Sequence, residues 1–250
     1  MTPSGIEFGI LGDKPSSPAP VLFLFAADLD LTLSDPAYNR VGTLLMRRGY
    51  ICVSLDAPCH GKDNRENATN PLASWRDRLD KGDDLVGEFN KRCTRVLDYL
   101  VAEHYVDASR VAAAGTSRGG FLALHWAAAE PRVRCVAAFS PVTELLALAE
   151  FKGTKDEARA RALDLQAVVA KLADRAIWIE IGNDDHRVGT DRAIAFMRAV
   201  VREATAKKLP PRIELHVTTT PGHSTPAVAH DDAAAWIAAH APVGDFGGGK

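Results

Sequence analysis

The sequence predicts an α/β protein built on a doubly wound, mostly parallel sheet. Short continuous apolar runs alternate along the chain with longer segments of helical spacing. Such runs are typical of strands in a parallel sheet, which helices cover on both faces. The chain has 250 residues, of which 46% are hydrophobic and 25% charged, as in an ordinary globular protein with a sizeable core. In a sheet of this kind, ligands bind beyond the carboxyl ends of the strands.

The strand candidates are short, and most of them are almost wholly apolar. A Pro/Ser-rich connection at 14–20 separates the first candidate from the second, which is the most apolar run of the chain. The last candidate leads into the segment TTTPGHSTP. The strand candidates cover residues 6–11, 21–25, 50–55, 110–114, 133–139, 176–181 and 211–217.

The helix candidates lie between these strands and show apolar residues at intervals of three and four. Their alternation with the strands predicts crossover connections, which is why we expect the sheet to be mostly parallel. The helix candidates cover residues 35–48, 84–104, 118–129, 156–173 and 190–206, followed by an Ala-rich segment that ends near His240.

We expect a single domain at 20–240, preceded by an N-terminal strand and connection at 1–19 and followed by a flexible Gly-rich tail at 241–250. Two segments exceed what a minimal sheet of this kind requires. The first is the polar stretch 61–81, which contains Trp75, and the second is 144–171. Both follow strand candidates, so we expect short lids over the ligand site.

Composition and motifs exclude several classes of function. The formal charge is -2 without a basic block, which argues against a nucleic-acid partner. The N-terminus has no signal-peptide pattern, and the longest apolar run falls far short of the ~20 residues of a membrane span. We therefore expect a cytoplasmic protein with free cysteines. No phosphate loop, zinc-binding HExxH or dinucleotide motif occurs, so we expect no cofactor and no metal. A homo-oligomer is compatible with the sequence.

The clearest motif is GxSxG at 115–119, between a strand candidate and a helix candidate. This is the setting of a nucleophile elbow, in which Ser117 sits on a sharp turn with its hydroxyl exposed. The turn forces strained dihedral angles on the serine and requires small neighbours such as Gly115 and Gly119. The alternative is that Ser117 only caps the helix.

With this motif the sequence resembles the α/β-hydrolase family over roughly residues 20 to 240. The family's order is nucleophile, acid, histidine. Gly182-Asn183-Asp184-Asp185-His186-Arg187-Val188 is similar to the family's G-x-x-D-x-x-V loop, and Pro221-Gly222-His223-Ser224 is similar to its Gly-His loop. The resemblance thus implies a triad of Ser117, Asp185 and His223. Asp184 and Asp185 alternatively serve as turn residues or helix caps.

The chemistry of acyl transfer explains why three groups are needed. A serine hydroxyl becomes a good nucleophile only when an imidazole can take its proton, and a carboxylate fixes the imidazole's tautomer. The oxyanion requires backbone N–H donors. We expect these from Arg118 and from Ala27, with Ala26 as second choice, because the loop after the first long strand has Phe25-Ala26 where the family often has His-Gly.

The pocket is less well defined by the sequence. His60 lies in the segment DAPCHG, which resembles a turn of the prolyl-oligopeptidase branch and follows a strand end. We expect His60 and Ala26 to line the pocket. For Trp75 two hypotheses stay open: it forms a wall of the acyl pocket, or it anchors its loop to the body of the protein.

The functional prediction is a serine esterase that forms an acyl-enzyme on a small-molecule ester, without a cofactor. The chain resembles small esterases and the catalytic domains of prolyl-oligopeptidase-type and dienelactone-hydrolase-like enzymes. Serine at the elbow argues for acyl transfer, because dehalogenases and epoxide hydrolases of this fold use Asp there and dienelactone hydrolases use Cys. The alternatives are a small serine peptidase or amidase, and a non-catalytic binding module on the same fold.

Overall fold

The computed structural model describes residues 1–64 and 70–241. It contains a seven-stranded sheet in the order β1-β3-β2-β4-β5-β6-β7. Every neighbouring pair is parallel except β1 and β3, which are antiparallel. The predicted doubly wound, mostly parallel sheet is thereby confirmed. The strands are β1 (Gly9–Leu11), β2 (Ala19–Phe25), β3 (Ile51–Ser54), β4 (Val106–Thr116), β5 (Val133–Phe139), β6 (Ala176–Gly182) and β7 (Ile213–Thr218).

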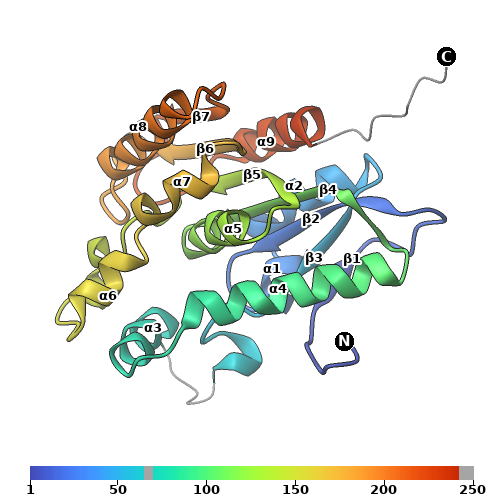
Figure 1. Cartoon of the computed structure of the whole chain (residues 1–250), viewed down its shortest axis with the longest axis horizontal. Helices are drawn as coiled ribbons and strands as arrows, with labels where there is room; N and C mark the ends of the chain where they lie inside the picture. Colours follow the sequence, from blue (N-terminus) through green and yellow to red (C-terminus); the bar gives the residue numbers. More distant parts are fainter. Residues whose placement is uncertain (65–69, 242–250) are drawn as a thin grey trace.

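Helices cover both faces of the sheet (Figure 1). Helices α4, α5 and α8 pack on one face, whereas α2 and α9 pack against each other on the opposite face. The helices are α1 (Leu29–Ser34), α2 (Pro36–Met46), α3 (Pro71–Asp80), α4 (Leu85–Ala102), α5 (Arg118–Ala129), α6 (Glu157–Ala162), α7 (Val169–Leu172), α8 (Thr190–Ala206) and α9 (Ala227–His240). Short 3-10 turns cover η1 (Gly61–Asp63), η2 (Leu145–Ala147), η3 (Ala149–Phe151) and η4 (Leu165–Val168).

The core explains why the central strands are apolar without interruption. In β2, successive side chains point to opposite faces, and both faces are buried. Phe23 packs against Trp126 of α5, with ring centroids 4.5 Å apart, while Leu22 and Leu24 join the cluster formed with α2 and α9. Strand β7 differs, because it is an edge strand whose residues are only partly buried.

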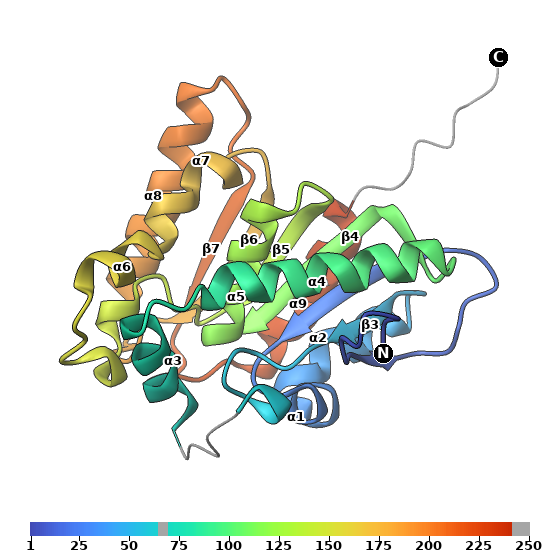
Figure 2. The ribbon, with the colours of Figure 1, turned by 60° about the horizontal axis from the view of Figure 1, so that its bottom comes forward.

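The two segments expected to act as lids lie at the same end of the molecule and contact each other (Figure 2). Asp80, the last residue of α3, accepts hydrogen bonds from the Thr154 hydroxyl at 2.6 Å and from the backbone N–H of Lys155 at 3.0 Å. Residues 65–69 of the first segment and 242–250 of the expected tail lie outside the described residues.

Two further observations concern membrane-spanning helices and the cysteines. None of the helices in residues 1–64 and 70–241 is long and apolar enough to cross a membrane. All four cysteines are buried, and none of them forms a disulfide in residues 1–64 and 70–241.

Candidate active site

Ser117 occupies a strained turn between β4 and α5. Its φ is 56° and its ψ is -115°, a conformation that costs energy for any residue with a side chain. The turn is held by the Ser117 N–H, which donates to the Phe139 carbonyl of β5 at 2.8 Å. A Cβ on Gly119 would overlap the Phe25 carbonyl, and one on Gly115 would overlap the Gly119 backbone. Ser117 therefore sits on the sharp strand-to-helix turn that the motif predicts, and only glycine fits at the two flanking positions.

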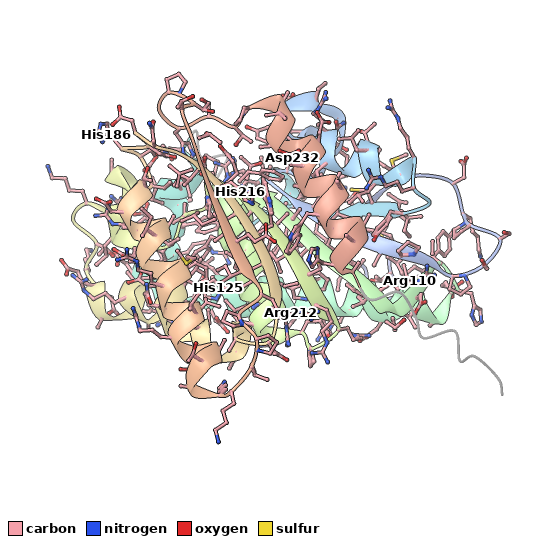
Figure 3. The ribbon with its side chains drawn as sticks, turned by 90° about the horizontal axis from the view of Figure 1, so that it is seen from above. Arg110, His125, His186, Arg212, His216 and Asp232 are labelled. Atoms are coloured by element: carbon pink, nitrogen blue, oxygen red, sulfur yellow. The ribbon has the colours of Figure 1, made fainter. Side chains whose placement is uncertain are left out.

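Three loops at the carboxyl ends of parallel strands bring the expected triad residues together. Ser117 follows β4, Asp185 follows β6 and His223 follows β7. Figure 3 shows His186, the neighbour of Asp185, at this end of the sheet, with Arg212, which precedes β7, at the other. The topology of a parallel sheet thus places residues more than a hundred positions apart in one site.

These three side chains form a continuous hydrogen-bonded chain. His223 Nε2 lies 2.9 Å from Ser117 Oγ, and His223 Nδ1 lies 2.8 Å from Asp185 Oδ2. Because a carboxylate oxygen accepts hydrogen bonds, we assign Nδ1 as the donor to Asp185, which leaves Nε2 to accept the serine hydroxyl. This is the geometry that general-base activation of a serine requires.

Asp185 and its neighbour Asp184 have opposite environments. Asp185 is 2% exposed, and its second oxygen accepts the backbone N–H groups of Arg187 at 2.9 Å and Val188 at 3.1 Å. Asp184 is largely exposed and pairs with His186 at 2.9 Å. Asp185 is thus a turn residue as well as the partner of His223, so the two hypotheses for it are compatible.

A cavity of about 570 Å³ opens beside Ser117 and His223. It is mixed in character, with three arginines among apolar and hydroxyl groups. Ala26 and Arg118, which the sequence singled out, line it. The sequence reasoning missed the other lining residues, which are Pro36, Ala37, Tyr38, Arg40, Thr116, Ser140, Arg187, Ser224, Thr225, Ala227 and His230. Arg187 and Thr225 each lie two positions after a triad residue, a signal that could have found them.

Of the two backbone N–H groups expected to bind the oxyanion, the structure is compatible with that of Arg118 and contradicts that of Ala27. Arg118 is the first residue of α5, where backbone N–H groups have no acceptor within the helix. Ala27 is wrong as the second donor, because its N–H donates to the Thr32 hydroxyl at 3.1 Å and the residue does not line the cavity. Ala26 lines the cavity and packs against the turn, since its Cα lies 2.9 Å from the position of a Cβ on Gly119. The loop therefore presents the residue that was the second choice.

His60 and Trp75 are structural anchors and do not line the cavity. Trp75 is 1% exposed, and its indole N–H donates to the Pro58 carbonyl at 2.6 Å. His60 is 6% exposed and binds the same carbonyl through Nδ1 at 2.8 Å. Burial lowers the pKa of His60 to about 4, so the ring is neutral at pH 7. The expectation that His60 lines the pocket is wrong, and of the two hypotheses for Trp75 the structure favours the anchor.

The two expected lids do not line the cavity either. Within their described residues, neither 61–81 nor 144–171 contributes to its wall. The second segment contacts the wall through Glu150, which pairs with the lining residue Arg187 at 2.7 Å. The two segments contact each other through Asp80, and this contact holds them at one end of the molecule.

Buried titratable groups surround the site. Glu180 of β6 is 0% exposed, and one of its oxygens accepts the Thr218 hydroxyl at 2.9 Å. Burial raises the pKa of this carboxyl to about 7. His230 of α9 lines the cavity, and burial lowers its pKa to about 4. The cavity wall therefore carries the neutral imidazole of His230 in addition to His223.

Comparison with known proteins identifies the relatives of this arrangement. The model of the family described as the prolyl oligopeptidase family matches residues 43–241. No curated protein matches the sequence.

Solved structures share the fold at low sequence identity. TT1662 from Thermus thermophilus superposes with a TM-score of 0.71 at 17% identity, over 96% of this chain and 95% of that one. Acetyl xylan esterase 1 from Thermoanaerobacterium sp. superposes with a TM-score of 0.62 at 17% identity, over 93% of this chain and 78% of the esterase.

A third similar structure is a longer protein. Porphyromonas gingivalis dipeptidyl peptidase 4 superposes with a TM-score of 0.68 at 16% identity, over 94% of this chain. This chain spans only 33% of the peptidase's length. At such identities the likeness establishes the α/β-hydrolase fold and leaves the substrate open.

Proposed function

Because this chain belongs to the prolyl oligopeptidase family and is a hydrolase of the α/β-hydrolase fold, we propose that it cleaves carboxylic esters through an acyl-enzyme formed on Ser117. The observation that carries the proposal is the hydrogen-bonded chain from Ser117 Oγ to His223 and on to Asp185, at 2.9 and 2.8 Å. The substrate is a small molecule that fits a cavity of about 570 Å³.

The proposed reaction proceeds in two steps. His223 Nε2 takes the proton of the Ser117 hydroxyl as the oxygen attacks the ester carbonyl, and then returns that proton to the departing alcohol. Water, activated by the same nitrogen, hydrolyses the acyl-enzyme to the carboxylic acid and frees Ser117. Asp185 stabilises the transient imidazolium. The backbone N–H groups of Arg118 and Ala26 are the proposed donors to the oxyanion, where one donor is worth about 3 kcal/mol.

The first test uses 4-nitrophenyl acetate and butyrate with a matched pair of serine variants. Ser117→Ala should lower kcat by about 10⁴-fold or more, because the triad loses its nucleophile. The control is Ser109→Ala, near the other end of β4, whose hydroxyl donates to Asp107 at 2.7 Å. Unchanged turnover in Ser117→Ala would reject the proposal.

A fluorophosphonate probe provides an independent readout. Active Ser117 should be labelled at one site that mass spectrometry identifies, and Asp185→Asn should slow the labelling. Absence of both labelling and ester turnover in the folded wild-type protein would favour a binding module on this fold.

Amide cleavage is the second candidate, because the matching family is one of peptidases. Amides are more demanding substrates, since the leaving amine departs only after His223 has protonated it. Pairs of 4-nitrophenyl esters and 4-nitroanilides with the same acyl group separate the two activities. We expect turnover of the esters, and comparable kcat/KM on the anilides would assign the protein to the peptidases.

A further inference from the structure

The guanidinium of Arg118 is a cation without an ion-pair partner among the described residues, and Arg118 belongs to the wall of the proposed substrate cavity. Arg118 directly follows Ser117 and lines the same cavity as Ser117 and His223. Its guanidinium interacts electrostatically with Tyr38 and Arg187, two further residues of that wall. Its Nε is buried, and no acceptor for it exists among the described residues. No carboxylate of residues 1–64 or 70–241 lies within ion-pair distance of it.

The other two arginines of the cavity are neutralised by the protein itself. Arg40 makes a bidentate contact with Asp231, with Nη2 lying 2.9 Å from each carboxylate oxygen. Arg187 pairs with Glu150 at 2.7 Å. Among the described lining residues, Arg118 is thus the one arginine that forms no ion pair.

Each of the two carboxylates nearest to Arg118 binds another group through one oxygen, and Oε2 of Glu150 is buried without a hydrogen-bond partner among the described residues. Glu150 and Asp28 both interact with the Arg118 charge over a longer distance. Glu150 binds Arg187, and Asp28 caps α1 by accepting the N–H of Leu31 at 2.8 Å. The imidazoles of His60 and His230 are neutral at pH 7, so they neither add to nor offset this charge.

A partly buried, unpaired guanidinium is costly, because it has lost water without gaining an anion. Burial accordingly lowers the pKa of Arg118. A ligand carboxylate would restore the lost interactions, since the guanidinium presents a planar fork that matches a carboxylate in two parallel hydrogen bonds. A single unpaired positive charge matches a monoanion better than a phosphate dianion.

We propose that the substrate carries a carboxylate, which Arg118 binds a few bonds away from the scissile carbonyl. The proposal rests on the hydrolytic function proposed above and narrows its substrate class to esters with a free acid group. Arg118 then has two separate roles: its backbone N–H serves the oxyanion, whereas its side chain selects the substrate.

The test compares matched anionic and neutral esters. On the acyl side, the pair is the 4-nitrophenyl monoester of adipic acid and the corresponding ester of adipamic acid. On the leaving-group side, the pair is 4-acetoxybenzoate and 4-acetoxybenzamide. We expect wild-type kcat/KM to favour the anionic member of one pair by about 10- to 100-fold, as for a charge-assisted hydrogen bond away from bulk water. Spontaneous hydrolysis of each ester is subtracted.

Substitutions assign the preference to Arg118. Arg118→Gln should reduce the ratio of anionic to neutral kcat/KM at least tenfold, chiefly through KM, and Arg118→Lys should restore part of it as a point charge. The ratio is the informative readout, because a disturbed oxyanion site would slow both esters equally. The matched control is Arg134→Gln, which removes a half-exposed arginine that pairs with Asp174 at 3.1 Å and does not line the cavity, and its ratio should stay within twofold of wild type.

The outcomes separate this proposal from the one on which it rests. Ester turnover without an anionic preference, or a preference that survives Arg118→Gln, overturns the carboxylate proposal and leaves the esterase intact. If no ester is turned over, calorimetry with Ser117→Ala still tests the site, using adipate and 4-hydroxybenzoate as ligands. Binding that Arg118→Gln weakens at least tenfold supports the proposal, and absence of binding rejects it.

Discussion

At the scale of single residues, the two adjacent carboxylates after β6 offer a sharp test of the triad. Asp185→Asn should lower kcat/KM by about 10⁴-fold, because an amide in place of the carboxylate leaves His223 in the wrong tautomer. Asp184→Asn changes an exposed side chain whose contact is the exposed His186, so its rate should stay within about twofold of wild type. Ester turnover and the melting temperature are measured for both variants.

A severe loss in both variants, with lowered melting temperatures, would indicate that the loop collapses and would leave the acid unassigned. The reverse ranking would assign the acid to Asp184. The melting temperature separates loop collapse from a catalytic defect. Asp185 also accepts two backbone N–H groups, and the carbonyl oxygen of an asparagine can accept them in the same way, so a purely catalytic defect should leave the melting temperature unchanged.

The sequence predicted the contact among Ser117, Asp185 and His223 because each lies in a local motif after a strand, and parallel strands end together. The sequence did not predict correctly which residue after β2 could donate the second N–H to the oxyanion. The Ala27 N–H donates to the Thr32 hydroxyl, and Thr32 is brought there by helix α1, which has no periodic signal in the sequence. Likewise, the roles of His60 and Trp75 depend on one shared acceptor, the Pro58 carbonyl, which no sequence pattern marks.

At the scale of elements, long amphipathic helices were predicted well and short ones were not. Helix α8 matches its predicted range, and α4 begins directly after Asp84, which caps it. Helix α1 was missed because six residues are too short for a periodic signal. The predicted helix at 156–173 is broken into α6, η4 and α7. Asp164, at the break, instead accepts the N–H of Leu145, so a distant contact overrides local helical spacing.

Helix α3 provides the second prediction, through Trp75. Trp75→Ala should lower the free energy of unfolding by about 3–5 kcal/mol, because the change empties a large buried volume against Phe121 and Pro58. The ratio of kcat/KM on butyrate to that on acetate should stay within about twofold of wild type, since Trp75 does not line the cavity. Urea unfolding and an ester chain-length series measure the two effects.

The matched control for this variant is Trp75→Phe, which retains an aromatic ring and loses the hydrogen bond to Pro58. We expect an intermediate loss of stability and the same chain-length ratio. A shifted acyl preference at an unchanged melting temperature would instead make Trp75 a wall of the acyl pocket.

At the scale of the whole molecule, buried titratable groups make stability depend on pH in two opposing directions. Burial lowers the pKa of His60, His125 and His230 to about 4, below the ordinary 6.5. Between pH 4 and 6.5 these histidines are protonated in the unfolded chain and neutral in the folded protein. The free energy of unfolding therefore falls as the pH drops from about 6.5 to about 4. Glu180 acts in the opposite sense, because its pKa of about 7 lies above the ordinary 4.5.

The last prediction concerns the opposite effects of Glu180 and His125 on how stability depends on pH. Between pH 4.5 and 6.5 the folded protein keeps a proton on Glu180 that the unfolded chain has lost, which gives that group a negative slope of stability against pH. His125, whose Nε2–H donates to the Leu163 carbonyl at 2.8 Å, gives a positive slope. Each slope approaches about 1.4 kcal/mol per pH unit for one proton.

Glu180→Gln should therefore steepen the rise of stability with pH across this window, whereas His125→Gln should flatten it by a similar amount. Both replacements keep a hydrogen-bonding side chain of similar reach, so the difference in slope reports the titration itself. Urea unfolding of the two variants and the wild-type protein at pH 4.5, 5.5 and 6.5 measures the slopes. Changes of the same sign in both variants would contradict the assignment, because the two buried groups would then not titrate in opposition.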